Sequence, residues 1–513
     1  MYLDARTLPD QSRIDADLAI IGGGVAGITL ARTLRGRGIR ICVVESGGLA
    51  FDADTQALYD GENTGIVYPL VGNRLRYLGG SSNHWGGYCR PLDAIDFEAR
   101  DWVPHSGWPF TIETLAPYYG PASEIVEISP MRFDDKAYWE AGTGQSLPDL
   151  PSGRMALRFV HFSPPTRFGQ RYGDELGDDD NVSVLLNANV TRIGATAMGQ
   201  HVEVLDIATL NGRHHQVRAR HYVLATGGLE NARMLLLSND VVPAGLGNQH
   251  DLVGRYFMEH PHLSDFGEIV VGDIERVPLI YRRRLRVEQR DGGATFIASD
   301  GYLREQRLLN AAFMAGEAGK YRRDKPPEWL HPHAQEHQDM LRAAYKFIGV
   351  PRVTPDSPLP DKIGEWLGLG CACEQAPNPD SRVTLADETD ALGLRKIRLN
   401  WQLTQQDRRS VVAHVRALAM EIGALGMGRM RMNIDDPDSW PELVAGGAHH
   451  MGTTRMHDDP RRGVVDRNGK VHGIDNLHIA GSSVFPTSGA ANPTLTIVAM
   501  TLRLADHLKS LGL

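Results

Sequence analysis

The sequence predicts an α/β fold, α+β overall, in two parts. Near the N-terminus, the short apolar strand 16–21 runs into the glycine-rich turn 22–27 and then into a helical pattern, which is how a parallel-sheet unit begins. A further apolar strand stops at the pair Gly227-Gly228 before another helical pattern. Residues 270–443 carry few motifs and predict a second domain on an antiparallel or mixed sheet. The first part is therefore expected to be Rossmann-like.

The first element is a dinucleotide fingerprint. Gly22, Gly24 and Gly27 permit a tight turn, close approach of the backbone to a pyrophosphate, and close packing of helix on strand. The start of the helix offers unpaired N–H groups to the phosphates. The second strand, 39–44, ends in Glu45, whose carboxylate would accept hydrogen bonds from ribose hydroxyls. An acidic residue there disfavours a 2′-phosphate, so the sequence predicts FAD or NAD and not NADP.

The strand 221–224 leads into Ala225-Thr226-Gly227, a segment typical of flavoproteins with a dinucleotide-binding domain. In such proteins this segment closes the cofactor domain. The apolar segment 181–193, which contains Val190, would then be the strand that brings its backbone to the adenine. A plain β–α connection remains the alternative interpretation of this motif.

Length and composition limit the class of protein. A chain of 513 residues and 56.5 kDa is long enough for two domains, or for one domain with large insertions. The net charge of −9 argues against a nucleic-acid partner, and four cysteines are too few for a disulfide framework. Because the sequence has neither a secretion signal nor a long apolar run, we expect a cytoplasmic protein without a membrane span.

Two motifs near the C-terminus carry residues suited to oxidising an alcohol. His449 lies in Gly446-Gly447-Ala448-His449-His450-Met451-Gly452-Thr453, and Asn492 lies in Gly489-Ala490-Ala491-Asn492-Pro493-Thr494-Leu495-Thr496. Alcohol oxidation requires a base for the hydroxyl proton, and a neutral imidazole with an ordinary pKa of about 6.5 is suited to that role. An amide N–H can orient the substrate oxygen and stabilise the developing alkoxide.

A third motif is the run Arg76-Tyr77-Leu78-Gly79-Gly80-Ser81-Ser82-Asn83-His84-Trp85-Gly86-Gly87. It is too rich in glycine for a regular element and too apolar for a solvent loop, as expected of backbone lying against a flat ligand. With the motifs at both ends, it resembles the glucose-methanol-choline (GMC) family of FAD-dependent oxidoreductases from about residue 17 to residue 508. The motifs are most similar to those of pyranose 2-oxidases, with bacterial glycoside 3-oxidases as plausible neighbours.

The resemblance gives His84 a specific role. In pyranose 2-oxidases and choline oxidases, the histidine four places after the glycine pair is bonded covalently to the 8α-carbon of the flavin, and His84 occupies that place. A hydrogen-bonding role near the isoalloxazine and a core histidine are the alternatives.

The resemblance also chooses between the two adjacent histidines. GMC members place the base in a His-x-x-Gly-Thr pattern, which implies that His449 is the catalytic base. His450 is the alternative, and in an extended segment it would face away from the flavin. Asn492 matches the second catalytic residue of the family, with the helix 495–508 directed at the flavin; an asparagine that merely caps this helix is the other interpretation.

The cofactor site implied by these motifs draws on seven segments of the chain. Its residues are Gly22, Gly24, Gly27, Glu45, Gly79, Gly80, Ser82, Asn83, His84, Trp85, Gly86, Val190, Ala225, Thr226, Gly227, Gly481, Ser482, Asn492, Pro493 and Thr494. The expected substrate contacts are Glu374, Gln375 and His450.

These expectations divide the chain discontinuously. The FAD-binding domain would comprise residues 1–100, 180–268 and 445–513, and the substrate-binding domain residues 101–179 and 269–444. The second domain would include a flavin-covering loop near its start and an insertion at 310–352, which could gate the site or contact another subunit of a homo-oligomer. Three histidines in that insertion, His331, His333 and His337, have no nearby cysteine and enclose a proline, so we predict no metal site.

The sequence thus predicts FAD-dependent oxidation of a secondary alcohol of a pyranose sugar or glycoside, at carbon 2 or carbon 3, to a keto sugar. The steps would be proton abstraction and hydride transfer to flavin N5, with oxygen or a quinone as electron acceptor. A choline-like or polyol alcohol oxidase or dehydrogenase is the alternative enzyme, and a flavin-binding carrier subunit is the alternative from another class.

Overall fold

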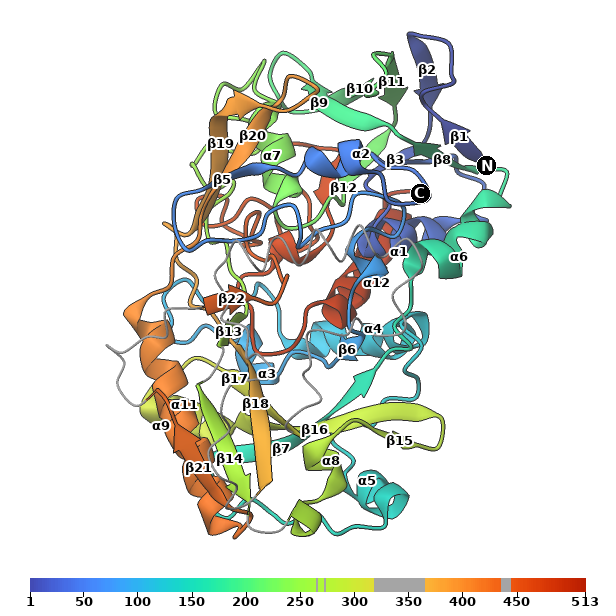
Figure 1. Ribbon diagram of the computed structural model, residues 1–513. Helices are drawn as coiled ribbons and strands as arrows, with labels where there is room; N and C mark the ends of the chain where they lie inside the picture. Colours follow the sequence, from blue (N-terminus) through green and yellow to red (C-terminus); the bar gives the residue numbers. More distant parts are fainter. Residues whose placement is uncertain (264–265, 272–273, 318–364, 435–443) are drawn as a thin grey trace.

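A computed structural model describes residues 1–263, 266–271, 274–317, 365–434 and 444–513. It places two large sheets at opposite ends of the molecule, with helices and loops between them (Figure 1). This arrangement confirms the predicted fold class.

The sheet near both termini is parallel and has six strands. In spatial order they are β1 (Tyr2–Asp4), β8 (Val182–Leu186), β4 (Ile41–Val44), β3 (Leu18–Ile21), β12 (His221–Leu224) and β23 (Leu477–Ile479). Every pairing in it is parallel. Its inner strands are continuous runs of buried apolar residues, as expected where both faces are covered.

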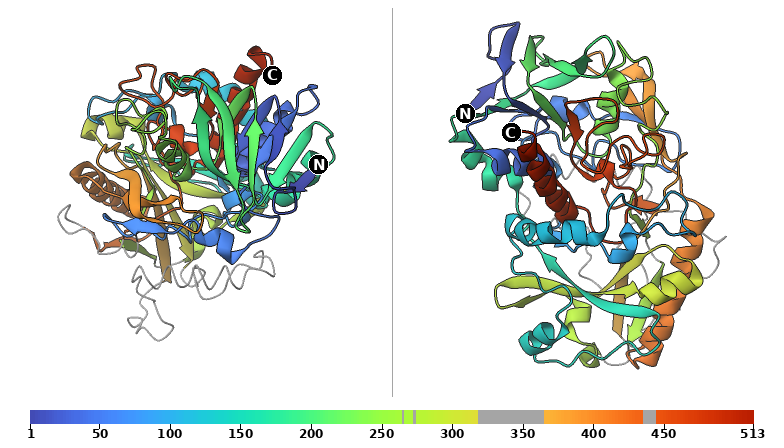
Figure 2. Two further views of the ribbon diagram at one scale, coloured as in Figure 1. Left: turned by 90° about the horizontal axis from the view of Figure 1, so that it is seen from above. Right: turned by 180° about the vertical axis from the view of Figure 1, so that it is seen from behind.

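Helix α1 (Val25–Leu34) begins directly after the glycine turn that ends β3. It packs against the last helix, α12 (Thr494–Ser510), which also packs on α4 (Ile112–Ile125). In Figure 2, α12 runs from the middle of the molecule toward the parallel sheet. The C-terminal helix therefore carries its first residues to the region between the two sheets.

The predicted strand 181–193 was wrong as a single element. It divides into β8 and β9 (Asn189–Ala195), which lies in a separate four-stranded sheet with β10 (Val202–Ala208), β11 (His214–Arg218) and β2 (Ser12–Asp15). The break falls at Asn187, whose φ of 55° turns the chain out of the extended conformation. Val190 consequently lies in β9 and not in the parallel sheet.

The second large sheet is antiparallel, as predicted. Its strands, in order, are β21 (Arg429–Met432), β14 (Gly267–Val271), β18 (Glu365–Cys373), β17 (Ala311–Glu317), β16 (Arg290–Ala298), β7 (Met155–Phe162) and β6 (Tyr88–Cys89), with β15 (Leu285–Val287) on β16. Helix α11 (Gln405–Ala424) packs against β7 and β21 and begins with a capping box. The segment expected to be an insertion at 310–352 therefore starts as a strand inside this sheet, while residues 318–352, including the three histidines, lie outside the described residues.

Short elements complete the described fold. The remaining strands are β5 (Gly61–Asn63), β19 (Arg382–Thr389) and β20 (Arg395–Asn400), which form one sheet, and the pair β13 (Pro261–Leu263) and β22 (Val444–Gly446). The remaining helices are α2 (Ala53–Ala57), α3 (Ala94–Phe97), α5 (Lys136–Thr143), α6 (Phe168–Gly177), α7 (Glu230–Leu237), α8 (Leu279–Arg282) and α9 (Asp300–Gln306). Among the helices described, none combines the length and apolar character needed to cross a membrane.

Candidate active site

The glycine turn after β3 has room for a ligand at one of its three fingerprint positions. Gly22 has a φ of 106°, and a Cβ there would lie 2.6 Å from the carbonyl oxygen of Ala225. A Cβ on Gly27 would overlap the carbonyl oxygen of Gly22. A Cβ on Gly24, by contrast, would meet no atom within 4 Å. The first and third glycines are thus required by the protein's own packing, whereas the space at Gly24 fits a dinucleotide pyrophosphate.

Glu45 lies at the carboxyl end of β4, beside this turn. Its two carboxylate oxygens accept hydrogen bonds from the backbone N–H groups of Gly23 and Gly47, each at 2.8 Å. The carboxylate is therefore fixed at the edge of the sheet where a dinucleotide would lie. Its contact with a ribose stays a prediction.

The run 76–87 folds against the glycine turn. The N–H of Gly79 donates to the carbonyl of Gly23 at 2.8 Å, and a Cβ on Gly80 would lie 3.2 Å from the Cα of Gly24. Residues Gly80–Asn83 form a 3₁₀ helix. Within the segment, the buried Ser82 hydroxyl donates to the Gly79 carbonyl and the Asn83 amide donates to the Leu78 carbonyl. The Trp85 indole donates to the carbonyl of Thr166, outside the segment, and Gly86 adjoins open space.

The loops after β12 and β23 are tied to each other and to the catalytic segment. Asn231 accepts hydrogen bonds from the Thr226 N–H and hydroxyl, both at 2.8 Å, and donates to Ser483 at 2.8 Å. The Ser482 hydroxyl donates to the backbone carbonyl of His450 at 2.6 Å. Gly227 and Gly481 have φ values of 89° and 113°, which make these sharp turns possible. The structure thus gathers the carboxyl ends of four parallel strands, β3, β4, β12 and β23, at one edge of the sheet.

The predicted catalytic pair is brought together. Nε2 of His449 lies 3.0 Å from Nδ2 of Asn492, although the two residues are 43 positions apart. Helix α12 begins at Thr494 with Pro493 at its cap, and no side chain bonds to that cap. Asn492 therefore does not cap the helix, and its amide is directed at the imidazole.

A second imidazole lies behind the first. Nδ1 of His260 lies 3.0 Å from Nδ1 of His449, and Nε2 of His260 lies 3.3 Å from the carbonyl oxygen of Ser488. Burial, followed by the charges that neighbouring histidines would carry, lowers the pKa of His449 well below its ordinary value. Burial lowers the pKa of His260 to about 4. Both rings are therefore neutral at pH 7.

One buried carboxylate organises this pair of histidines. Glu259 accepts hydrogen bonds from the backbone N–H groups of His449 at 2.7 Å, His260 at 2.8 Å and Gly447 at 3.0 Å. It also accepts the hydroxyl of Tyr68. Burial raises the pKa of Glu259 to about 7, and these hydrogen bonds oppose the rise.

Tyr68, Glu259 and His260 are functional residues that the sequence motifs did not predict. The available signal was the run Glu259-His260-Pro261-His262, in which ionisable residues follow the apolar pair 257–258. Buried ionisable groups need partners, so such a run indicates a network. No comparable signal marks Tyr68 in the sequence.

The two glycines before His449 allow this network to form. A Cβ on Gly446 would overlap the ring of Tyr68, and a Cβ on Gly447 would lie 2.7 Å from Nδ1 of His449 and 2.8 Å from Nε2 of His262. The Gly-Gly pair of the motif is therefore explained by close approach of aromatic rings.

The side chain of His450 points in a different direction from that of His449, as expected for adjacent residues of an extended segment. Its Nε2 lies 2.8 Å from the hydroxyl of Tyr68. Burial, and then the charges of Arg74 and His84, lower the pKa of His450 to about 3. His84 therefore lies close enough to the catalytic segment to influence it electrostatically, and its covalent bond to a flavin stays a prediction.

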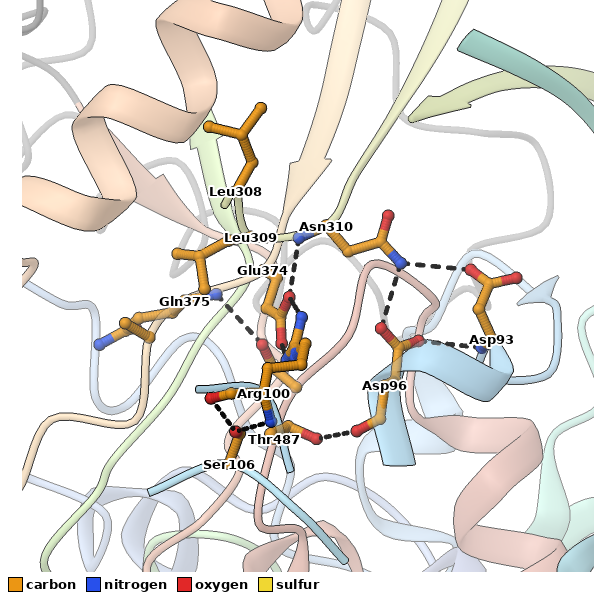
Figure 3. A network of polar contacts seen from close by, with 12 residues as sticks. Asp93, Asp96, Arg100, Ser106, Leu308, Leu309, Asn310, Glu374, Gln375 and Thr487 are labelled. Carbon is orange, nitrogen blue, oxygen red and sulfur yellow. Dashed lines mark hydrogen bonds and ion pairs between the residues drawn. The ribbon is translucent and has the colours of Figure 1, made fainter. Parts of the chain in front are cut away.

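Glu374 and Gln375 are used by the protein itself. Glu374 forms a fully buried ion pair with Arg100, with N–O distances of 2.9 and 2.5 Å, and accepts the N–H of Asn310 at 2.7 Å (Figure 3). The side-chain oxygen of Gln375 accepts the N–H of Glu259 at 3.0 Å. Because these atoms already have partners within the protein, we do not propose either residue as a substrate contact.

The network of Figure 3 also supports the loop that carries Asn492. Asn310 donates to Asp96 at 3.1 Å, and the backbone carbonyl of Asp96 accepts the hydroxyl of Thr487. The N–H of Gln375 donates to the hydroxyl of Ser488 at 3.1 Å. The loop 487–492 is thus held by residues that adjoin strands β17 and β18 of the antiparallel sheet.

Comparisons with known proteins find similar sequences and a similar fold. Residues 377–501 match the family model described as GMC oxidoreductase. The chain is 25% identical to 2-methyl-1,2-propanediol dehydrogenase of Mycolicibacterium austroafricanum over 96% of this chain and 95% of that protein. It is 29% identical to a C-glycoside 3-oxidase of Arthrobacter globiformis over 58% of this chain and 62% of that protein. The structure of pyridoxine 4-oxidase from Mesorbium loti shares the fold, with a TM-score of 0.61 at 19% identity over 96% of this chain and 99% of that one.

The fold and the histidine–asparagine pair are those expected of a dinucleotide-dependent oxidoreductase. With the match over residues 377–501 and the similarity of nearly the whole chain to a diol dehydrogenase, the chain is an oxidoreductase that acts on CH–OH groups and is similar to GMC oxidoreductases. The family implies FAD as the cofactor, and the open space at Gly24 fits such a group.

Proposed function

We propose that this enzyme oxidises a secondary alcohol of a pyranose sugar or glycoside, at carbon 2 or carbon 3, to the corresponding keto sugar. The observation that carries the chemistry is the 3.0 Å contact between Nε2 of His449 and Nδ2 of Asn492, at the edge of the sheet where the glycine turn lies. The sugar assignment is supported by the motifs around His84 and His449 and by the similarity to a C-glycoside 3-oxidase. FAD, when bound, supplies the hydride acceptor.

The two side chains have complementary roles toward a substrate hydroxyl. His449 is neutral at pH 7 because its pKa is lowered, so Nε2 can take the hydroxyl proton. The amide of Asn492 donates a hydrogen bond to the same oxygen and stabilises the negative charge that develops there. An alcohol oxygen that replaces the His449–Asn492 contact would meet a proton acceptor and a proton donor together.

The cofactor would be held mainly by backbone. The glycine turn around Gly24, the loop 79–86 and the loops at 225–227 and 481–482 would surround it, with Glu45 at the ribose. We propose that His84 forms the covalent bond to the flavin. Acid precipitation of the holoenzyme tests this: flavin colour retained in the pellet supports the bond, and colour released to the supernatant excludes it.

The function is tested by anaerobic mixing of the holoenzyme with free sugars, glycosides, choline and aliphatic diols, followed by admission of air. We expect flavin bleaching by sugars or glycosides, and chemical analysis of the product should place the keto group at carbon 2 or carbon 3. Rapid recolouring in air would identify an oxidase, and slow recolouring that a quinone accelerates would identify a dehydrogenase.

A small diol or other polyol is the second candidate, because one of the relatives that match over nearly the whole chain is a diol dehydrogenase. Bleaching by diols alone would overturn the sugar assignment and leave alcohol oxidation in place. A His449→Ala variant should retain FAD but lose about 10²–10⁴-fold in flavin reduction rate, the usual contribution of a general base. Unchanged reduction by that variant would overturn the role of His449.

A further inference from the structure

We propose that His260 is a positioning residue that fixes the ring tautomer of His449 and so directs the lone pair of Nε2 at the substrate hydroxyl. This inference rests on the proposed role of His449 as the base. It adds a residue that touches neither substrate nor cofactor in the proposed reaction and acts through another side chain.

The direction of the hydrogen bonds that join His449, His260 and Ser488 follows from the atom at the Ser488 end. A backbone carbonyl can only accept, so Nε2 of His260 carries the proton in its 3.3 Å contact with Ser488. A neutral ring protonated at Nε2 has its lone pair on Nδ1. Because Nδ1 of His449 lies 3.0 Å from that lone pair, His449 must donate from Nδ1.

The contact between His449 and Asn492 is consistent with the same direction of donation. With its proton on Nδ1, the neutral His449 ring has its lone pair on Nε2, where it accepts the amide proton of Asn492 at 3.0 Å. Each donor in the series Asn492, His449, His260, Ser488 therefore meets an acceptor. The opposite direction fails, because the Ser488 carbonyl has no proton to donate.

The two rings are also fixed in space. Glu259 binds the backbone N–H of both His260 and His449, at 2.8 and 2.7 Å, so one carboxylate sets the separation of the two residues. The rings meet edge to face, with centroids 4.9 Å apart and an interplanar angle of 72°. His260 is completely buried, which keeps its ring neutral and unable to donate from both nitrogens.

Loss of this acceptor would allow the wrong tautomer. A neutral imidazole exchanges its proton between two nitrogens, and the hydrogen bond made by one of them decides which is protonated. Without His260, the proton of His449 can move to Nε2, where the ring cannot accept the substrate proton. The ratio of two neutral tautomers does not depend on pH, so raising the pH would not restore activity.

The test compares three holoenzyme variants. His260→Leu removes the acceptor, and His260→Asn keeps one because its side-chain oxygen lies near the place of Nδ1. His414→Asn is the matched control, since His414 is also completely buried and its Nε2 contacts a backbone carbonyl, that of Leu309, at 2.6 Å. Flavin content, the flavin reduction rate constant across pH 6–9, and the apparent substrate dissociation constant are measured for each.

We expect His260→Leu to bind FAD and substrate normally and to reduce its flavin about 10–100-fold more slowly at every pH. His260→Asn should recover most of this loss, and His414→Asn should stay within about twofold of wild type. Ring ¹⁵N chemical shifts of histidine-labelled protein provide a direct readout: the His449 signals, assigned by their absence in His449→Ala, should report protonation at Nδ1 in wild type and a shift toward Nε2 protonation in His260→Leu.

The outcomes separate this inference from the proposed function. If His449→Ala reduces its flavin at the wild-type rate, the proposed base is wrong. If His449→Ala is slow while His260→Leu matches wild type in rate and in ¹⁵N shifts, the base stands and the role of His260 is overturned. Equal losses in His260→Leu and His260→Asn with unchanged His449 shifts would also overturn it, because they would indicate packing alone.

Discussion

The two sides of the candidate site are built in opposite ways. Around the glycine turn the protein presents backbone, and at Gly24 a side chain is absent where a ligand would lie. Around His449 it presents buried polar side chains: Tyr68 donates to Glu259, Glu259 accepts the backbone N–H of His260, and the His260 ring contacts the His449 ring. Adding a methyl group should therefore damage the first side, whereas removing a polar partner should damage the second.

The largest effect is expected from the ion pair that supports the base side. Arg100→Leu would leave Glu374 buried without its cationic partner, because both side chains are fully inaccessible to solvent. Breaking such a pair from one side costs about 3–5 kcal/mol in the free energy of unfolding. Urea denaturation of the holoenzyme measures the loss.

Arg6→Leu is the control, because it removes an ion pair with Asp4 that is largely exposed. Such a pair contributes about 1 kcal/mol or less. A Glu374→Gln variant with wild-type stability and weaker substrate binding would contradict our interpretation and return Glu374 to the substrate site.

The fold was largely predictable because its signals are local. The strand, glycine turn and helix around Gly22–Gly27 are consecutive in sequence, so their pattern could be identified directly. The helix predicted at 495–508 is confirmed as Thr494–Ser510. The division of 181–193 could not be predicted, because it depends on the left-handed conformation of a single residue, Asn187.

The residues of the candidate site could be predicted only where they lie in a recognisable sequence motif. His449 and Asn492 lie in recognisable segments, and the structure places them in contact. Glu259 lies 190 positions from His449 and 191 from Tyr68, so no local spacing connects the three. Glu374 looked like a substrate ligand because the sequence does not reveal its pairing with Arg100.

A pH-dependent effect on stability should follow from Glu259. Burial raises its pKa from 4.5 to about 7 in the folded protein. The folded state therefore holds this proton more tightly than the unfolded state, and the resulting stability is complete below pH 4.5 and lost as the pH rises through 7. At about 1.4 kcal/mol for each unit between the two pKa values, the change is on the order of 3 kcal/mol.

Comparison of wild type with Glu259→Gln isolates this contribution. The buried histidines change stability in the opposite direction with pH, but they do so in both proteins. The difference in free energy of unfolding between the two should vary across pH 4.5–7.5 and level off above it. Glu113→Gln is the control, because the pKa of the exposed Glu113 is lowered, and a curve parallel to wild type is expected for it. A parallel curve for Glu259→Gln would contradict the raised pKa.

The smallest effects on stability are expected at the glycine turn, where Gly27→Ala and Gly24→Ala should separate folding from cofactor binding. The Cβ of Ala at 27 would overlap the Gly22 carbonyl, so helix α1 must shift, at a cost of about 1–3 kcal/mol. The Cβ of Ala at 24 would meet no protein atom within 4 Å, and Gly24 has a φ of −87°, which alanine adopts readily.

The free energy of unfolding of the Gly24→Ala apoprotein should therefore lie within about 0.5 kcal/mol of the wild-type value, as is usual for surface substitutions. The same variant should bind FAD more weakly. Urea denaturation of the apoprotein and titration with FAD measure the two properties independently. If Gly24→Ala binds FAD as wild type does, the space beside Gly24 is not the place of the pyrophosphate, and the contrast between a backbone side and a side-chain side fails. If Gly27→Ala alone loses FAD, and does so together with stability, cofactor binding at this turn depends on the packing of α1 and not on the open space.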